Sequence, residues 1–370
     1  MALEDKNLIS NFKDSAEYFY TKKENYNQKS KHWKVYDYRK FNLENLVNFR
    51  SNDSLSTGLD DQTDQFSFKI FAKILEEIPE SYVLNNLPTK KMGNSKNLIK
   101  YKNVLIDYNK LIHIHWFFSI EKEIFKETKK LNICEIGGGF GSFAELFIKN
   151  YNSKLLSIDL PEANLMTSYY LNKNFTKKKI YLFIDYNDKK ILTYEDFIFN
   201  DIIILPPNCN VDKKIKFDLF INARSMMEMN FDTIKSYFNF IHQYSHKNSF
   251  FLNINRYEKT SVGESIRIAN YPYDKNWKVI ISKSSFNQNW IHFLLTKRCF
   301  DNVARNIVEE LDRIKLIGEK FHGLHKDYSP SFVFLKSFIK KFLRLLLLDK
   351  FIIILGNILF KISLKLRNFK

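Results

Sequence analysis

The sequence is poor in cysteine and has no apolar run long enough to cross a membrane. Its three cysteines, Cys134, Cys209 and Cys299, are far apart and have no C-x-x-C spacing. Neither a disulfide framework nor a thiolate zinc site is therefore indicated, and a reducing compartment is expected. The histidines and carboxylates also show no compelling metal-ligand spacing, so we predict a reaction that needs no metal ion.

The two ends of the chain lack the features of secreted and membrane-spanning proteins. The uncharged apolar run Phe351–Phe360 has ten residues, whereas a helix needs about twenty to span a bilayer. The N-terminal stretch carries acids where a secretory signal peptide needs positive charge, and it has no uninterrupted apolar core. We therefore expect the protein in the cytoplasm.

Basic residues are abundant, and much of their excess lies near the C-terminus. The net charge is +17, and residues 336–370 hold nine basic residues against one acid, a net +8. Around 335–346, apolar and basic residues would occupy opposite arcs of one helix. The apolar arc holds Leu335, Phe338, Ile339, Phe342, Leu343 and Leu346, and the basic arc holds Lys336, Lys340, Lys341 and Arg344. This pattern predicts binding to an anionic membrane surface or a partner, whereas the alternative is packing on the catalytic domain or a second subunit.

The length and the 45% hydrophobic content allow a substantial globular core. Four segments are predicted along the chain. They are a mostly helical N-terminal cap (1–120), a cofactor-binding domain (121–300), a helical connector (301–332) and the basic tail (333–370).

Within the cap, two helices are predicted from apolar spacing. One follows an apolar stripe at helical spacing that Pro79 ends, and the other covers Leu105–Lys126. His113 and His115 would face opposite sides of the second helix. Structural or surface roles are favoured for both over metal ligation.

The rest of the chain is organised around residues 131–162. An apolar run that ends at Ile136 predicts a buried strand, and Gly137–Gly141 follows as a tight turn. Ser142 and Glu145 have the spacing of a capping box, which predicts that a helix begins there. A second strand would then lead to Asp159, so this stretch is half of a nucleotide-binding βαβ unit.

The spacing of the glycines favours S-adenosylmethionine over a dinucleotide. Glu135-x-Gly137-x-Gly139-x-Gly141 differs from the G-x-G-x-x-G of dinucleotide folds, in which pyrophosphate lies on a helix N-terminus. Glu135 would hold the amino group of the cofactor, and Asp159 would accept hydrogen bonds from the ribose diol. A glycine-rich turn without a ligand is the competing interpretation.

Further strands predict an α/β fold. Ile180–Ile184 and Ile202–Leu205 are both candidates for the third strand, whereas Phe217–Ile221 and Ser249–Ile254 are predicted as the fourth and fifth. A hairpin of two β-rich runs follows within 278–296. This pattern matches the mostly parallel, seven-stranded sheet of class I methyltransferases, in which one reversed strand is inserted.

Loops that follow the strands would carry the chemistry, because ligands lie beyond the carboxyl ends of parallel strands. Leu160 and Asn222 are therefore added to the cofactor-binding residues, and Arg224, Asn255 and Arg256 to the substrate-binding residues. The two arginines would hold a carboxylate or a phosphate of the substrate, unless each simply pairs with a surface acid.

Methyl transfer to a hydroxyl needs a base. Glu228 is the first candidate, because flanking methionines would exclude water and raise its pKa. A structural acid near a helix N-terminus is an equal alternative for this residue. His242 is the second candidate, although an ordinary helix residue is the more common reading of its position.

Several motifs together resemble the bacterial sugar O-methyltransferase family. They are EIGGGFGSFAEL (135–146), SIDLPE (157–162), FDLFINARSMMEM (217–229), Tyr237-Phe238 and FFLNINR (250–256). Gly93-Asn94-Ser95 corresponds to a G-N-P turn, with serine in place of proline. The resemblance implies a class I methyltransferase fold and methyl transfer to a sugar hydroxyl in surface-glycan synthesis.

Other functions remain open from the sequence. The net charge suggests an RNA or DNA methyltransferase, but residues 222–229 read NARSMMEM and not the N-P-P-Y type that grips a flipped base. We therefore expect a sugar or glycan acceptor and no nucleic acid. A small-molecule methyltransferase, or a cofactor-binding scaffold that has lost catalysis, is a further alternative.

Overall fold

The computed structural model describes most of the chain up to residue 321. The described residues are 5–21, 42, 46–50, 64–88, 92–95, 98–101, 103–126, 130–260, 262–286, 290–300 and 306–321. The predicted basic tail and part of the predicted connector lie outside them. No helix in these described ranges is long and apolar enough to cross a membrane.

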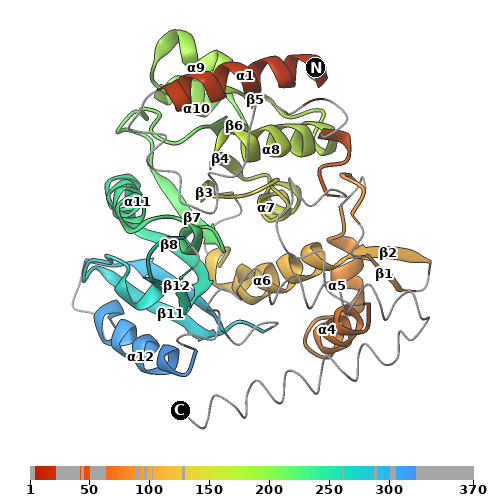
Figure 1. The fold of residues 1–370 in the computed structure, drawn as a ribbon, viewed down its shortest axis with the longest axis vertical. Coiled ribbons are helices and arrows are strands. Elements are labelled where there is room, and N and C mark those ends of the chain that lie inside the picture. Colours follow the sequence, from red (N-terminus) through yellow and green to blue (C-terminus); the bar gives the residue numbers. More distant parts are fainter. Residues whose placement is uncertain are drawn as a thin grey trace. The chain divides into compact units, whose positions relative to one another are not determined.

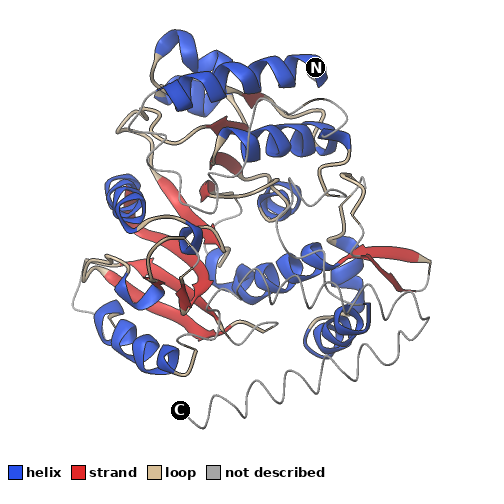
Figure 2. Cartoon of the chain, in the orientation of Figure 1, coloured by secondary structure: helices blue, strands red, loops and turns tan. Residues whose placement is uncertain are grey.

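A mixed sheet forms the centre of the described chain (Figures 1 and 2). Its strand order is β11-β12-β8-β7-β3-β4-β6-β5. The strands are β3 (Asn132–Ile136), β4 (Lys154–Ile158), β5 (Ile180–Tyr181), β6 (Ile202–Leu205), β7 (Phe217–Ala223), β8 (Ser245–Arg256), β11 (Trp277–Ser284) and β12 (Ile291–Arg298). Six of these strands pair in parallel, whereas β12 is antiparallel to both β8 and β11.

This strand order is that of a class I methyltransferase. When the two-residue β5 at the edge is set aside, the chain order across the sheet becomes 3-2-1-4-5-7-6, and the seventh strand is the reversed one. The predicted fold class and the C-terminal hairpin are therefore confirmed. Of the two candidates for the third strand, β6 takes that place. The other, Ile180–Ile184, is a strand only at Ile180–Tyr181, because a helix begins at Phe183, and this short β5 extends the sheet to eight strands.

Alternate side chains of the central strands enter two hydrophobic cores, because successive residues of a strand point to opposite faces. Ile133 and Leu155 belong to one core, and Cys134 and Leu156 belong to the other. All four residues of β6 are buried. Strands covered on both faces have nearly continuous apolar sequences. This is why the apolar runs in the sequence predict the central strands.

Helices cover both faces of the sheet. One core includes side chains of α6 (Tyr108–Ile124), α7 (Ala144–Tyr151) and α8 (Pro161–Asn174). The other includes side chains of α9 (Phe183–Lys189), α10 (Tyr194–Phe199), α11 (Phe231–Tyr244) and α12 (Ile307–Glu319). Short elements follow β7 and β8, namely η3 (Met226–Glu228), β9 (Glu258–Lys259), β10 (Ile266–Arg267) and η4 (Ile268–Asn270).

The N-terminal part contacts the sheet domain at two separate places. The helix α1 (Asp5–Thr21) packs against α8 and α9, and Tyr20 Oη donates to the Glu162 carboxylate at 2.6 Å. The other elements are α4 (Asp64–Glu77), α5 (Glu80–Asn85), β1 (Leu98–Tyr101) and β2 (Val104–Asp107). They gather around α6, and Trp116 of α6 reaches Ser285 beyond β11 with an Nε1 to Oγ distance of 3.4 Å.

The predicted helix over Leu105–Lys126 begins three residues later than expected. Leu105 lies in β2, which pairs with β1, and α6 starts at Tyr108. Asp107 is the reason, because its carboxylate accepts a hydrogen bond from the Lys110 backbone N at 3.0 Å and so caps the helix. The predicted end of the first helix at Pro79 is confirmed by α4, which ends at Glu77.

Candidate cofactor and acceptor site

Loops from four neighbouring strands meet at the carboxyl edge of the sheet. The glycine loop follows β3, Asp159 follows β4, residues 224–229 follow β7, and the chain beyond Arg256 follows β8. Open α/β sheets bind ligands at this edge, where adjacent connections leave in different directions.

Two of the glycines in the loop are required for different reasons. A Cβ atom on Gly137, at φ +74°, would lie 1.8 Å from Ser225 Oγ, so the loop after β7 packs directly on it. Gly139 also has a positive φ, +62°, but a Cβ there would meet no atom within 4 Å. The backbone at Gly139 thus borders open space, which is where a ligand could approach it closely.

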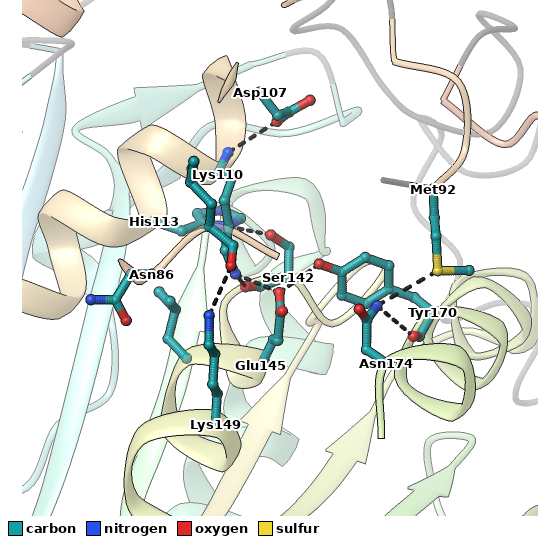
Figure 3. A network of polar contacts seen from close by, with 12 residues as sticks. Asn86, Met92, Asp107, Lys110, His113, Ser142, Glu145, Lys149, Tyr170 and Asn174 are labelled. Atoms are coloured by element: carbon teal, nitrogen blue, oxygen red, sulfur yellow. Dashed lines mark hydrogen bonds and ion pairs between the residues drawn. The ribbon is translucent and has the colours of Figure 1, made fainter. Parts of the chain in front are cut away.

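The predicted capping box at the start of α7 is wrong. The helix begins at Ala144, and Ser142 makes no cap hydrogen bond there. Glu145 is buried and accepts hydrogen bonds from Lys110 Nζ at 2.6 Å and from Tyr170 Oη at 2.5 Å. Figure 3 shows this network, in which a buried lysine of α6 takes the carboxylate that the capping box would need. Lys110 also donates to the Ser142 carbonyl at 2.8 Å and so fixes the end of the glycine loop.

Glu135 presents a buried carboxylate with an unused oxygen. The residue is 2% exposed, and its Oε2 has no hydrogen-bond partner among the described residues. Burial, and then the nearby charge of Asp159, raises its pKa to about 8. A Cβ on Gly138 would lie 2.3 Å from this Oε2. The Glu135 carboxylate thus packs closely against Gly138, a glycine that the E-x-G-x-G-x-G pattern does not include.

Asp159 uses its carboxylate to hold the loop and still has room for a ligand. Its Oδ2 accepts from Gly139 N at 2.9 Å, and its Oδ1 accepts from Leu160 N at 2.7 Å. A carboxylate offers about four lone-pair sites, so about two remain. Burial raises its pKa to about 7 against the lowering effect of these backbone hydrogen bonds. Two neighbouring acids that both have a raised pKa are typical of a functional site.

An apolar cavity lies beside Asp159. It measures about 550 Å³ including its open mouth, and Ile158, Leu205, Pro206 and Tyr237 are among its lining residues. Tyr237 is close enough to Asp159 that the acid contributes to the raised pKa of the tyrosine. Its walls are mostly apolar, as a heteroaromatic base requires. Tyr237 is a site residue that the sequence marked only as part of a motif.

Asn222 and Asn255 have positioning roles rather than open binding surfaces. Both are fully buried. Asn222 donates to Ile136 O at 2.8 Å and accepts from Met226 N and from Asn255 Nδ2. Asn255 in turn accepts from Met227 N at 3.1 Å and donates to Asn253 Oδ1 at 2.6 Å. Because Asn255 is fully buried and its amide is already hydrogen-bonded through both Oδ1 and Nδ2, a positioning role replaces the predicted direct contact with substrate. The pair ties three loops together.

Glu228 does not lie in the apolar setting that the sequence suggested. Met226 and Met227 turn inward and are buried, whereas the Glu228 carboxylate pairs with Lys259 Nζ at 2.7 Å. Arg224 and Arg256 are also close enough for Glu228 to affect their pKa values. The expectation that methionines isolate this acid is wrong, because three cations surround it. A base already paired with lysine is poorly prepared to accept a proton.

His242 lies at the opposite edge of the sheet. Its Nε2 is 3.8 Å from Asp274 Oδ2, and Asp274 accepts from Arg298 at 2.6 Å. Arg298 ends β12, which runs antiparallel to β8, so this group sits at the amino edge of the parallel strands. His242 is therefore corrected from a catalytic candidate to a residue that supports the hairpin.

The fold brings His113 to the glycine loop. Its Nδ1 lies 3.2 Å from Ser142 Oγ in the glycine loop, and its ring packs between Trp116 and Phe143. Burial and the charges of Lys110, Arg50 and Arg224 lower its pKa well below the ordinary value, so it is neutral. His115 faces elsewhere and contacts Glu77 at 3.0 Å. The opposite directions of the two histidines were predicted, but the contact of His113 with the glycine loop was not.

Comparisons with known proteins assign no activity to the chain. No protein-family model and no curated protein matches the sequence. Among solved structures, an O-methyltransferase family protein from Burkholderia thailandensis is 9% identical, and the match covers 53% of this chain and 59% of that one with a TM-score of 0.35. The mitomycin 7-O-methyltransferase MmcR is 13% identical over 52% of this chain and 57% of its own, with a TM-score of 0.33.

A SAM-dependent methyltransferase from Aquifex aeolicus is 11% identical, and the match covers 49% of this chain and 88% of that protein with a TM-score of 0.31. The chain thus covers less than two thirds of the first two of these structures. Likeness at this level does not assign an activity. What the strand order and the glycine loop define is the class of fold, that of class I methyltransferases, and the activity rests on the residues of the site.

Proposed function

We propose that this protein transfers a methyl group from S-adenosylmethionine to a hydroxyl of a sugar. The observation that carries the proposal is the unpartnered oxygen of buried Glu135, set beside Asp159 and beneath a glycine loop that borders open space. An unpaired carboxylate oxygen in a buried setting is costly unless a ligand completes it. A cationic ammonium group next to a ribose diol matches these two acids.

Different residues of the chain would bind different parts of the cofactor. Glu135 would hold the ammonium group, Asp159 would accept from the ribose hydroxyls, and the cavity lined by Ile158 and Tyr237 would take the adenine. S-adenosylmethionine supplies an electrophilic methyl group when bound. Asn222 and Asn255 hold the loops in the geometry that in-line transfer requires, since positioning contributes much of the rate of such reactions.

His113 is the base that this arrangement favours. It is neutral, it borders the glycine loop through Ser142, and it lies within electrostatic reach of Arg224 in the loop after β7. A neutral imidazole can accept the proton that the acceptor hydroxyl loses. Glu228 then serves as the partner of Lys259.

A sugar acceptor is supported by the motif resemblance and by the polar, cationic character of the loops after β7 and β8. The expected setting is surface-glycan synthesis on the cytoplasmic side. The predicted metal independence and membrane contact of the tail stay predictions.

A transfer assay tests the activity. Purified protein with methyl-labelled S-adenosylmethionine is expected to label one or more members of a panel of nucleotide-linked sugars and glycan fragments, and to leave RNA unlabelled. Labelled products would be separated and counted. Transfer to RNA alone would contradict the sugar proposal, and cofactor binding without any transfer would favour the scaffold alternative.

The two raised acids predict a pH dependence of stability. A carboxyl with a raised pKa binds its proton more tightly in the folded state, so its contribution to stability is present at low pH and is lost as pH rises through the folded pKa. With pKa values near 8 for Glu135 and 7 for Asp159, the melting temperature of the ligand-free protein should fall between pH 6 and pH 9.

Binding the cofactor requires the ionised acids, so its stabilisation should change in the opposite direction. The rise in melting temperature with S-adenosylhomocysteine, which keeps the ammonium group and the diol, should be larger at pH 8 than at pH 6. In Glu135→Gln both pH effects should be flatter. An equal pH profile in this variant would show that Glu135 does not titrate in the site.

A further inference from the structure

We propose that Arg224 and Arg256 bind an oxyanion of the acceptor, so that the substrate is an acidic or phosphorylated sugar rather than a neutral one. This inference rests on the proposed function and narrows it. The two arginines end adjacent strands, since Arg224 follows β7 directly and Arg256 is the last residue of β8. Both therefore lie at the carboxyl edge of the sheet, close enough for the charge of one to act on the other.

Both guanidinium groups lack a partner in the part of the chain that the structure describes. Neither makes a side-chain hydrogen bond or an ion pair there, and the Nε of Arg256 is fully buried and unsatisfied. Other arginines of the fold are paired, as Arg298 is with Asp274 at 2.6 Å and Arg267 is with Glu258 at 2.9 Å. Both side chains are partly exposed, so these cations without a partner are accessible to an anion from outside the chain, which would offset the cost of their partial desolvation.

The two charges also repel each other. Burial, and then the neighbouring charge of Arg256, lowers the pKa of Arg224 to about 10, which places the two groups in one electrostatic environment. Among the described residues, the acid whose charge acts on both arginines is Glu228, and it is already held by Lys259. Three cations and one anion leave this cluster with an excess of two positive charges. The neutral imidazole of His113 does not reduce that excess.

The backbone of Arg224 is held in an unusual conformation. Its φ is +63°, and its N donates to Ile254 O at 2.7 Å. Residues other than glycine seldom adopt this region, and where they do the strain is often found at a binding site. The chain thus uses a strained position to present a cation, although asparagine or glycine would fit the turn better.

The ligand chemistry follows from the geometry of guanidinium groups. Their planar fork matches the two oxygens of a carboxylate or a phosphate, and it does so better than a lysine would. A sugar carboxylate and a sugar phosphate share this chemistry. Either group would place the sugar beside the loop after β7, with the hydroxyl that is methylated turned toward the cofactor residues and His113.

Thermal shift measurements on the full-length protein can test the site without any turnover. The probes are sodium glucuronate, glucose 1-phosphate and neutral glucose, each at millimolar concentration with ionic strength matched by sodium chloride. We expect the melting temperature of the wild type to rise with one or both anionic probes and not with glucose. A response to glucuronate alone would assign a carboxylate, and a response to glucose 1-phosphate alone would assign a phosphate.

Variants separate this site from the general basicity of the protein. Arg256→Gln should weaken binding of the anionic probe at least tenfold, and Arg224→Gln should weaken it similarly. The matched control is Arg313→Gln, because Arg313 is half exposed and paired with Glu310 on α12. It should keep the wild-type response. Because Arg256 has no partner to lose, its variant should fold and should melt no lower than the wild type without a probe.

Two results would overturn the inference. One is an equal response to the anionic probes in the wild type and in Arg256→Gln, which would place the anion elsewhere. The other is a wild type that responds to neither anion. The proposed function has its own test, because a protein that does not bind S-adenosylhomocysteine would contradict it. A protein that binds S-adenosylhomocysteine, and whose two arginine variants both methylate neutral sugars as well as the wild type does, would contradict only the acidic acceptor.

Discussion

Asp159→Ala is expected to weaken binding of S-adenosylmethionine about 100-fold or more. The carboxylate would accept two charge-assisted hydrogen bonds from the ribose diol, each contributing about 1.5–3 kcal/mol, and about 1.4 kcal/mol corresponds to a tenfold change in affinity. The same carboxylate accepts from Gly139 N at 2.9 Å, so its loss also frees the loop. Isothermal titration calorimetry with S-adenosylhomocysteine would measure the change.

Two further variants make this result specific. Asp159→Asn keeps the size of the side chain and an oxygen that can accept from Gly139, and should lose less affinity than the alanine variant. Asp232→Ala removes an aspartate that is 93% exposed at the start of α11, and should bind as the wild type does. Wild-type affinity in Asp159→Ala would remove this residue from the cofactor site.

The part of the site that is local in sequence could be predicted. Strand, glycine loop, helix and strand follow one another within residues 131–162, and the apolar runs and the acid at the end of β4 are visible without any distant partner. The order of the strands in the sheet could be inferred as far as the hairpin. The choice between β5 and β6 could not, since both are short apolar runs and only pairing with β4 separates them.

The parts that depend on distant contacts could not be predicted. Glu145 has the spacing of a capping residue, but Lys110, which lies 35 positions earlier, takes its carboxylate. Glu228 has apolar neighbours in sequence, yet its partner in space is Lys259, 31 positions later. Each sequence inference was locally sound, and each was overridden by a charge that another element brought near.

The same reasoning explains the two histidines. The sequence position of His242 within α11 does not predict which edge of the sheet the side chain lies near. The edge depends on the length of α11 and on its direction relative to β8. His113 lies in a segment far from the motifs, and its role follows only from the packing of α6 against the glycine loop. The spacing of two histidines on one helix does not predict which loop either of them will contact.

His113→Gln is expected to lower the rate of methyl transfer by about 100-fold to 10,000-fold, the range that a general base contributes. Glutamine keeps a polar side chain near Ser142 but cannot accept the proton. Binding of S-adenosylhomocysteine should change little, because Glu135 and Asp159 remain. Single-turnover transfer of a labelled methyl group would measure the rate, and calorimetry would measure the binding.

Controls for this variant come from the same helix and from the rival base. His115→Gln alters the next histidine of α6, which contacts Glu77 instead of the loop, and should keep the rate within a few fold. Glu228→Gln removes the partner of Lys259 and should reduce transfer less than His113→Gln does, because the imidazole that takes the proton is intact. A larger loss in Glu228→Gln, together with near-normal transfer in His113→Gln, would return the role of base to the glutamate. In that case the ion pair between Glu228 and Lys259 would have to open when the acceptor binds. An anionic group of the acceptor that pairs with Lys259 and the two arginines could open it.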